Sequence, residues 1–201
     1  MPNHYDQDID PVKVDHAELL KKKYNNNFNV RDDLKHLSVE DIRAQRTTKG
    51  FAVATFNLKG DLNLGSIMRT AEITGARDFF ILGHRQWDRR CAGVVQNYLN
   101  FEKLDECVDW GTTCDLVIAK DYSPIVIEQG GMILGEWIDV FNKSSLTVSW
   151  EAYPPCFIFG PEDTGFPKDF PAHISLPQVG VSRSYNVSAA AAIVLHAWSF
   201  R

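Results

Sequence analysis

Residues 173–201 read HISLPQVGVSRSYNVSAAAAIVLHAWSFR, and this closing stretch decides the fold class. A short apolar strand, Ile174 to Leu176, runs into a loop rich in Pro, Gly and Ser, and an Ala-rich helix begins near Asn186. In α/β proteins this order of elements forms ligand sites, because loop amides and the positive end of the helix face the bound group. We therefore expect a loop-built ligand pocket at this point of the chain.

The closing helix has no polar face. From Val187 to Trp198 only Ser188 and His196 are polar, so the pattern predicts a helix that is covered on every side. Either the rest of the chain or a second copy must supply that cover.

Upstream of this unit, short apolar runs alternate with helical patterns. The runs are typical of buried strands, and their separation by helices favours a parallel sheet with helices on both faces. The predicted strands are 51–56, 78–82, 115–119, 124–128 and 156–159, and residues 88–111 are expected to form a helix, a short strand and another helix. The region between residues 128 and 156 is weakly patterned.

One helix is predicted from about Leu64 to Gly75. Its core stripe comprises Leu64, Ile67, Met68 and Ala71, at the i, i+3, i+4, i+7 spacing. Gly65, Ser66, Arg69 and Glu72 fall together on another face of this helix.

Domain organisation follows from the change of pattern at Phe51. Residues 51–201 form the predicted domain, and residues 1–50 are expected to be an extension, partly helical or irregular, that packs or contacts RNA. Within it, residues 16–24 could form a helix, and Ser38 with Asp41 resembles a capped helix start.

Composition does not indicate a nucleic-acid-binding protein. The 201 residues are 44% hydrophobic, the net charge is −5 and the isoelectric point is about 5.7. Two basic clusters, within 21–49 and 84–90, are nevertheless compatible with a phosphate backbone, although solvated faces explain them equally well. Their candidate RNA contacts are Arg43, Arg46, Arg85, Arg89 and Arg90.

Cysteine spacing indicates neither a zinc site nor a disulfide framework, so no metal is expected. The four cysteines are Cys91, Cys107, Cys114 and Cys156. No signal-peptide pattern or long apolar run is present, which predicts a cytoplasmic protein with no membrane contact.

Three polar stretches are candidates for chemistry, and each also has a purely structural interpretation. Asn63 to Arg69 could be a helix cap and a solvated side chain, Gly160 to Pro167 an acidic turn, and Gly180 to Asn186 a loop that caps a helix. No nucleophile–base pair and no P-loop pattern stands out. The residues alone predict a pocket and leave its chemistry open.

The same stretches, taken in order, resemble the three signature motifs of the SpoU family of RNA 2′-O-ribose methyltransferases, of the SPOUT class. The motifs are Asn63-x-Gly65-x-x-x-Arg69, then Phe159-Gly160-x-Glu162-x-x-Gly165-Phe166, then Ile174-x5-Gly180-x3-Ser184-x-Asn186-Val187. Each motif alone is weak, whereas three in the right order are specific, and they span the predicted domain. The resemblance implies a parallel α/β sheet with a C-terminal trefoil knot, and a homodimer packed through the knot region and the closing helix.

The resemblance also implies a cofactor and roles for individual residues. S-adenosylmethionine would donate a methyl group to a ribose 2′-hydroxyl of structured RNA, tRNA before rRNA. The catalytic set would be Asn63, Arg69, Glu162, Ser184 and Asn186. The cofactor would be held by Glu128, Phe159, Gly160, Ile174, Leu176 and Val187. Because arginine is a poor base at neutral pH, Arg69 is expected to bind phosphate and orient the substrate.

The sequence departs from the family pattern at three positions. Tyr185 stands where Leu or Ile is usual, Pro161 stiffens the second motif, and Arg183 adds a charge to the third. Arg183 and Tyr185 would alter which RNA is accepted. Two alternatives stay open: a knotted RNA-binding or assembly protein without catalysis, and an enzyme that methylates a base nitrogen.

Overall fold

The computed structural model describes residues 30–56, 60–83, 86–104, 109–143, 153–161, 165–166 and 169–201. Two compact units divide the chain, Met1–Leu37 and Ser38–Arg201. In the first, the described residues form one exposed 3-10 turn, η1 (Asp32–Leu34), beside an ion pair between Arg31 and Asp33 at 2.6 Å. The helix expected at residues 16–24 lies outside the described residues.

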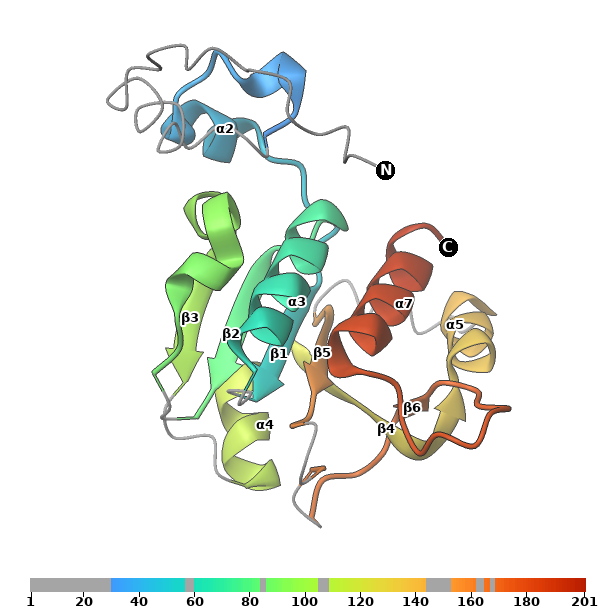
Figure 1. Ribbon diagram of the computed structural model, residues 1–201. Helices are drawn as coiled ribbons and strands as arrows, with labels where there is room; N and C mark the ends of the chain where they lie inside the picture. Colours follow the sequence, from blue (N-terminus) through green and yellow to red (C-terminus); the bar gives the residue numbers. More distant parts are fainter. Residues whose placement is uncertain are drawn as a thin grey trace, which may run out of the picture. The chain divides into compact units, whose positions relative to one another are not determined.

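A six-stranded parallel sheet forms the second unit, in the order β3-β2-β1-β5-β4-β6 (Figure 1). The predicted parallel α/β sheet flanked by helices is therefore confirmed. Its strands are β1 (Ala52–Phe56), β2 (Asp78–Leu82), β3 (Asn100–Leu104), β4 (Ser123–Ile133), β5 (Pro155–Phe159) and β6 (Ile174–Ser175). Its helices are α2 (Val39–Gln45), α3 (Asp61–Ile73), η2 (Arg89–Asn97), α4 (Trp110–Ile118), α5 (Leu134–Lys143) and α7 (Val187–Ser199).

Alternate residues of the central strands feed two cores, one on each face of the sheet. In β5, Phe157 and Phe159 pack with α3, α5 and α7, whereas Cys156 and Ile158 pack on the opposite side with α4. These side chains are buried because a parallel sheet is covered on both faces, and this explains why the strands read as continuous apolar runs.

Helix α2 begins as its sequence predicts. The Ser38 hydroxyl accepts a hydrogen bond from the Asp41 amide at 3.1 Å, which satisfies one of the amides that a helix N-terminus leaves without a partner.

The structure differs from the sequence-based expectations in two elements. The expected strand at residues 115–119 is wrong: residues 115–118 belong to helix α4 and Ala119 is its C-cap. The Asp109 carboxylate caps the start of that helix by accepting a hydrogen bond from the Thr112 amide at 2.8 Å. The weakly patterned region contains helix α5, which had no predicted counterpart. Gly65, on the second face of α3, is buried because η2 packs on it so closely that a Cβ would collide with the carbonyl of Cys91.

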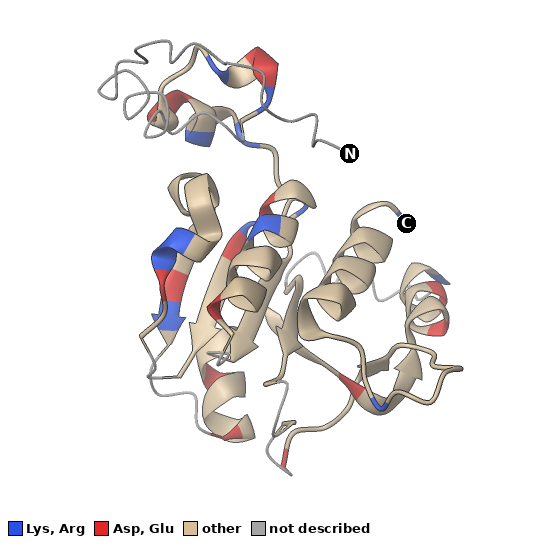
Figure 2. Cartoon of the chain, in the orientation of Figure 1, with Lys and Arg blue, Asp and Glu red and all other residues tan. Residues whose placement is uncertain are grey.

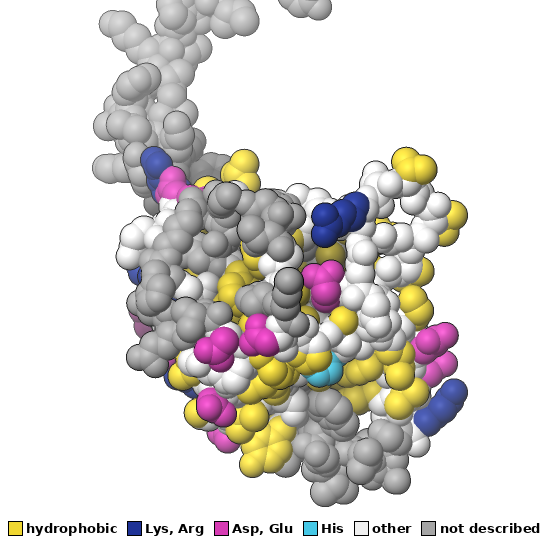
Figure 3. Space-filling view, turned by 90° about the horizontal axis from the view of Figure 1, so that it is seen from below, with side chains coloured by type: hydrophobic (Ala, Val, Ile, Leu, Met, Phe, Trp, Pro, Cys, Tyr) yellow, Lys and Arg dark blue, Asp and Glu magenta, His cyan; other side chains and the backbone are white. Residues whose placement is uncertain are grey.

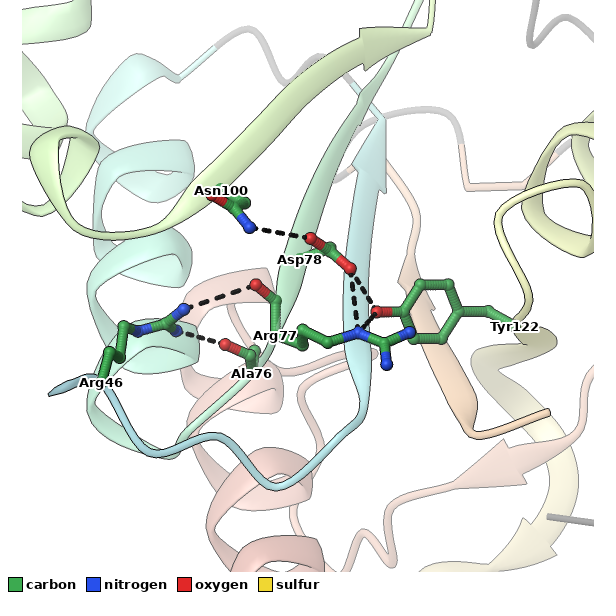
Figure 4. Close-up of polar contacts among 6 residues, drawn as sticks. All are labelled: Arg46, Ala76, Arg77, Asp78, Asn100 and Tyr122. Atoms are coloured by element: carbon green, nitrogen blue, oxygen red, sulfur yellow. Dashed lines mark hydrogen bonds and ion pairs between the residues drawn. The ribbon is translucent and has the colours of Figure 1, made fainter. Parts of the chain in front are cut away.

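The amino ends of the strands carry a side-chain network (Figure 4). Tyr122, 1% exposed, receives a 2.6 Å hydrogen bond from Arg77 Nε and donates its own hydroxyl to the Asp78 carboxylate. Asn100 donates to the other Asp78 oxygen at 3.4 Å. Burial and the bond to Asp78 raise the pKa of Tyr122 above its usual range, so the phenol stays protonated.

Arg46 ties the segment that follows α2 to this end of the sheet. Its guanidinium donates to the backbone carbonyls of Ala76 and Arg77 (Figure 4). It also lies 3.9 Å from the Glu72 carboxylate. The Arg46 side chain is only 11% exposed. The Arg46 guanidinium thus binds groups of the protein itself rather than facing solvent.

Helix α7 is not covered on all sides within a single chain. Ala191, Val194, Leu195 and Trp198 are buried, but an exposed stripe runs along the other side of the helix. That stripe consists of Ala189, Ile193, His196 and Phe200, spaced as one face of a helix.

Among the described residues, no helix is both long enough and apolar enough to cross a membrane.

Candidate functional site

A pocket of about 200 Å³ lies at the carboxyl edge of the sheet, at the end of β5 and beside residues 127–129 of β4, beneath the loop that leads into α7. Ligands of parallel α/β proteins bind at this edge, because the strand-to-helix loops gather there. Figure 3 views the molecule from this side and shows hydrophobic side chains with acidic ones around them. The pocket is lined by Ile127, Glu128, Gln129, Phe159, Gly160, Pro161, Gly165, Phe166, Leu176, Gln178, Arg183, Ser184, Tyr185, Val187 and Ala190.

The second motif forms one wall. After β5 the backbone passes through Gly160, where a Cβ would lie 2.7 Å from the ring of Phe166, so only glycine lets that ring close over the main chain. Gly165 has a φ of 67°, a conformation that favours glycine. Glu162, the carboxylate expected in this motif, lies outside the described residues.

Strand β4 forms the opposite wall through an irregularity in its pairing. Both Ile127 and Met132 pair with Ile174 of β6, so the residues between them bulge out of the ladder. Gly130 adopts a φ of 88° within the bulge. Further along, a Cβ on Gly131 would lie 2.7 Å from the backbone of His173. The bulge brings Glu128 and Gln129 to the pocket.

The third motif closes the pocket with a loop held by two hydrogen bonds. Gln129 donates its side-chain amide to the carbonyl of Arg183, and Tyr185 donates its hydroxyl to the carbonyl of Pro177 at 3.1 Å. Between these bonds, Ser184 lines the pocket. The Ser184 hydroxyl is therefore presented from a fixed backbone.

Asn186 joins the third motif to the first. Its side-chain oxygen caps α7 by accepting from the Ser188 amide at 2.9 Å. Its side-chain nitrogen donates to the Asn63 side chain on α3 at 3.2 Å. Residues 123 positions apart in the sequence thus lie in contact beside the pocket.

Arg69 is further along α3. Six residues separate it from Asn63, which corresponds to about 9 Å along a helix. The side chain is exposed and does not line the pocket. Of the five residues expected to be catalytic, the structure therefore places Ser184 in the pocket wall and Asn63 with Asn186 beside it.

Five of the six residues expected to hold the cofactor line the pocket: Glu128, Phe159, Gly160, Leu176 and Val187. Ile174 does not line the pocket; it is fully buried where β6 pairs with β4. The combination of apolar walls with backbone at Gly160 and polar groups at the rim fits a flat, polar-edged ring such as adenine.

Four of the arginines expected to contact RNA are described, and they lie in different environments. Arg43 donates to the Asn97 carbonyl at 2.5 Å, and Arg46 is turned inward as described above. Arg89 lies over the ring of Phe101, and Arg90 pairs with Asp88 at 2.6 Å. Figure 2 shows basic and acidic positions alternating along the ribbon at and around β3. Arg85 lies outside the described residues.

No cluster of metal ligands occurs among the residues that the structure describes. Cys91, Cys114 and Cys156 are free thiols. Burial raises the pKa of the Cys114 thiol to about 11, so it is protonated at neutral pH.

Sequence reasoning did not identify Phe166 or Gln178 as pocket residues. Phe166 could have been found from the sequence. It comes directly after Gly165 in the turn that follows a strand, and an aromatic ring in such a turn can fold back over the end of the strand. Gln178 had none, because a polar residue in a polar loop is unremarkable.

The SpoU rRNA Methylase family model matches residues 50–196. No curated protein matches the chain. Among solved structures, the TrmH/SpoU tRNA modifying enzyme of A. aeolicus is similar, with a TM-score of 0.61, 18% identity and coverage of 80% of each chain.

Two further structures extend the comparison. The SpoU methyltransferase AviRb of Streptomyces viridochromogenes in complex with AdoMet has a TM-score of 0.56 and 20% identity over 78% of this chain and 59% of its own. An RNA 2′-O ribose methyltransferase has a TM-score of 0.54 and 20% identity over 76% of this chain and 56% of its own. The present chain therefore spans less than two thirds of the length of both.

The family model covers most of the chain, including the sheet, the pocket and the three motifs. The protein belongs to the SpoU rRNA methylase family.

Proposed function

We propose that this protein transfers a methyl group from S-adenosylmethionine to a ribose 2′-hydroxyl of structured RNA. The observation that carries the proposal is the bond between Asn186 and Asn63, beside a pocket lined by Gly160 and Ser184. It brings three separate motifs to one place, and none of them needs the others for capping or turn formation. Family membership and the AdoMet-bound relative AviRb support the choice of cofactor.

When bound, S-adenosylmethionine supplies the methyl group on its sulfonium. The residues of this chain would mainly position the reactants, since in-line alignment of oxygen, methyl and sulfur contributes much of the rate. Phe159, Leu176 and Val187 would hold the adenine of the cofactor and exclude water from it. Ser184 and Asn186 orient the ribose hydroxyl, and Arg69 binds a phosphate of the substrate rather than taking its proton.

We further propose that the substrate is tRNA rather than rRNA. The A. aeolicus tRNA modifying enzyme supports this choice, because it is similar in size as well as in fold. Arg43, Arg89 and Arg90 would contribute to the RNA surface together with Arg85. Arg46 is set aside, because its donors already bind the Ala76 and Arg77 carbonyls.

We also propose a homodimer and a C-terminal trefoil knot formed by the segment around Gly160 and by residues 174–187. The exposed α7 stripe supports a second copy, since Ile193 is 42% exposed and Phe200 65% exposed. Helix α3 adds Leu62 and Ile73, which are 76% and 67% exposed. In sedimentation, the wild-type protein should be a dimer and Ile193→Asp a monomer, whereas a monomeric wild type would contradict the proposal.

The decisive experiment maps 2′-O-methylation across total RNA from cells with and without this gene. A site that disappears without the gene, and returns when purified protein and S-adenosylmethionine are added, supports the proposal. If the modification that disappears is a methylated base nitrogen rather than a methylated ribose, the protein is a base methyltransferase and the proposal is wrong. If no modification changes while RNA still binds, the protein is a binding module.

A further inference from the structure

Arg183 sits at the rim of the pocket with its guanidinium open to solvent. The residue lines the pocket and is exposed. In the described part of the chain, no carboxylate pairs with it, whereas Arg31 and Arg90 each form an ion pair at 2.6 Å. Its five N–H donors therefore form no ion pair with a described carboxylate and are available to a ligand.

The backbone that carries Arg183 is anchored. Gln129 binds the Arg183 carbonyl from the β4 bulge, and Tyr185 binds the Pro177 carbonyl on the other side of the loop. Because the anchor acts on the main chain, the side chain keeps its freedom to reach a ligand while its starting point is fixed. The two hydrogen bonds thus fix the backbone position of Arg183 and leave its guanidinium charge unpaired with any described carboxylate.

The charges around the pocket make this cation significant. Glu128 lines the same pocket, and the whole chain carries a net charge of −5. Figure 2 shows a basic segment of this loop beside an acidic segment of β4. One oxygen of Glu128 accepts the Gln129 amide at 2.8 Å, so that carboxylate is held along its own strand rather than against the guanidinium. Among the described pocket residues, an approaching polyanion therefore meets Arg183 as a positive group beside one carboxylate, that of Glu128.

Resting on the function proposed above, we propose that Arg183 binds the RNA phosphate next to the target ribose, with Gln129 as its positioning residue. Ser184 follows directly, and consecutive Cα atoms are about 3.8 Å apart, so a ribose at Ser184 has its phosphates within reach of the arginine. A guanidinium matches two phosphate oxygens with parallel hydrogen bonds. Such a contact fixes the register of the RNA and does not read its bases.

The test compares four variants of the full-length protein: Arg183→Gln, Arg183→Lys, Gln129→Ala and, as a control, Lys143→Gln. Lys143 is 80% exposed on α5. Its substitution by Gln removes one positive charge, as Arg183→Gln does, but at a position that does not line the pocket. Three quantities are measured: filter binding of total RNA from cells without the gene at several salt concentrations, calorimetric affinity for S-adenosylmethionine, and the KM and kcat of methyl transfer.

Arg183→Gln should weaken RNA binding and raise KM by about tenfold, and lower the slope of log affinity against log salt by about one. Its affinity for S-adenosylmethionine should be unchanged. Arg183→Lys should restore part of the affinity and the full salt slope. Gln129→Ala should raise KM with the salt slope intact, because the charge is still present but no longer held in position. Lys143→Gln should behave as wild type.

RNA binding by Arg183→Gln that equals wild type would overturn the inference. So would a comparable loss of S-adenosylmethionine affinity, since the guanidinium would then bind the carboxylate of the cofactor. Filter binding does not require turnover, so the inference can fail or hold independently of whether the wild-type protein methylates RNA.

Discussion

The two ends of the sheet use polar side chains in opposite ways. At the amino ends of the strands, Arg77, Asp78 and Tyr122 bind one another, and the phenol is buried. At the carboxyl ends, Gln129 and Tyr185 bind backbone carbonyls. The first arrangement consumes the donors and acceptors of its side chains. The second fixes the main chain and leaves neighbouring groups, Ser184 and Arg183, open to a ligand.

This difference separates stability from activity along a single sheet. A group whose partners are all within the protein contributes to folding, and its loss leaves a buried partner without a hydrogen bond. A group presented on an anchored loop contributes little to folding and much to binding. Substitutions at the two ends should therefore affect different measurements.

The largest expected effect is on activity, at Arg69. Arg69→Ala should lower kcat/KM for RNA by about 100-fold, because the substrate would lose the group that orients it. Calorimetric affinity for S-adenosylmethionine and the free energy of unfolding should not change. Arg69→Lys, which keeps the charge, should recover part of the rate. Full turnover by Arg69→Ala would show that the residue has no role in positioning.

The next effect tests whether the pocket wall can tolerate one added methyl group. Gly131→Ala should lower the free energy of unfolding by about 1–3 kcal/mol, because its Cβ would lie 2.7 Å from the backbone carbon of His173 and force β6 away from β4. Gly135→Ala on α5 is the matched control, since nothing lies within 4 Å of that position. Urea unfolding of both variants measures the difference, and equal stabilities would refute the close approach.

The same substitution made at each end sharpens the comparison. Tyr122→Phe should lower the free energy of unfolding by about 1 kcal/mol, because Asp78 loses a donor in a buried site, and should leave kcat unchanged. Tyr185 is 44% exposed, so Tyr185→Phe should lower the free energy of unfolding by less than about 0.5 kcal/mol. Thermal unfolding of the two variants at one pH gives both values. A larger loss for Tyr185→Phe would reverse the assignment of the two ends.

The smallest effect is a dependence of stability on pH. Burial lowers the pKa of His173 below its ordinary value, and its Nδ1 accepts a hydrogen bond from the Val126 amide at 3.2 Å. The unfolded chain therefore binds a proton more readily, so stability is fully present above a pH of about 6.5 and falls as the pH drops toward the folded pKa. The contribution of His173 is the part of the slope between pH 7 and 5 that His173→Asn removes. An identical slope in the variant would rule it out.

Much of the sheet was predictable because buried parallel strands have a plain signature. β2 and β5 are runs of consecutive apolar residues, and their predicted positions agree with the structure to within one residue. The strand predicted at residues 115–119 is wrong for the same reason, since Leu116, Val117 and Ile118 form an equally apolar run within a helix. Only the cap at Asp109, seven residues before Leu116, distinguishes helix α4 from a strand.

Helix α5 could have been found. Its apolar residues have helical spacing: Leu134, Trp137, Ile138 and Phe141. The ring centroids of Trp137 and Trp198 lie 5.5 Å apart. The pairing of Asn63 with Asn186 could not be found from local pattern, because it depends on how α3 and α7 pack on the sheet. The role of Gln129 could not be predicted, since it depends on a bulge that periodicity does not reveal.

The bond between Asn63 and Asn186 also has an electrostatic consequence. Asn186 is the N-cap of α7, and Asn63 lies in the first turn of α3, so the bond brings the starts of two helices together. Each helix start carries roughly half a positive charge from its aligned peptide dipoles. Together they place a fixed positive potential at the mouth of the pocket that no titration can remove, where it favours oxygen atoms as they gain negative charge.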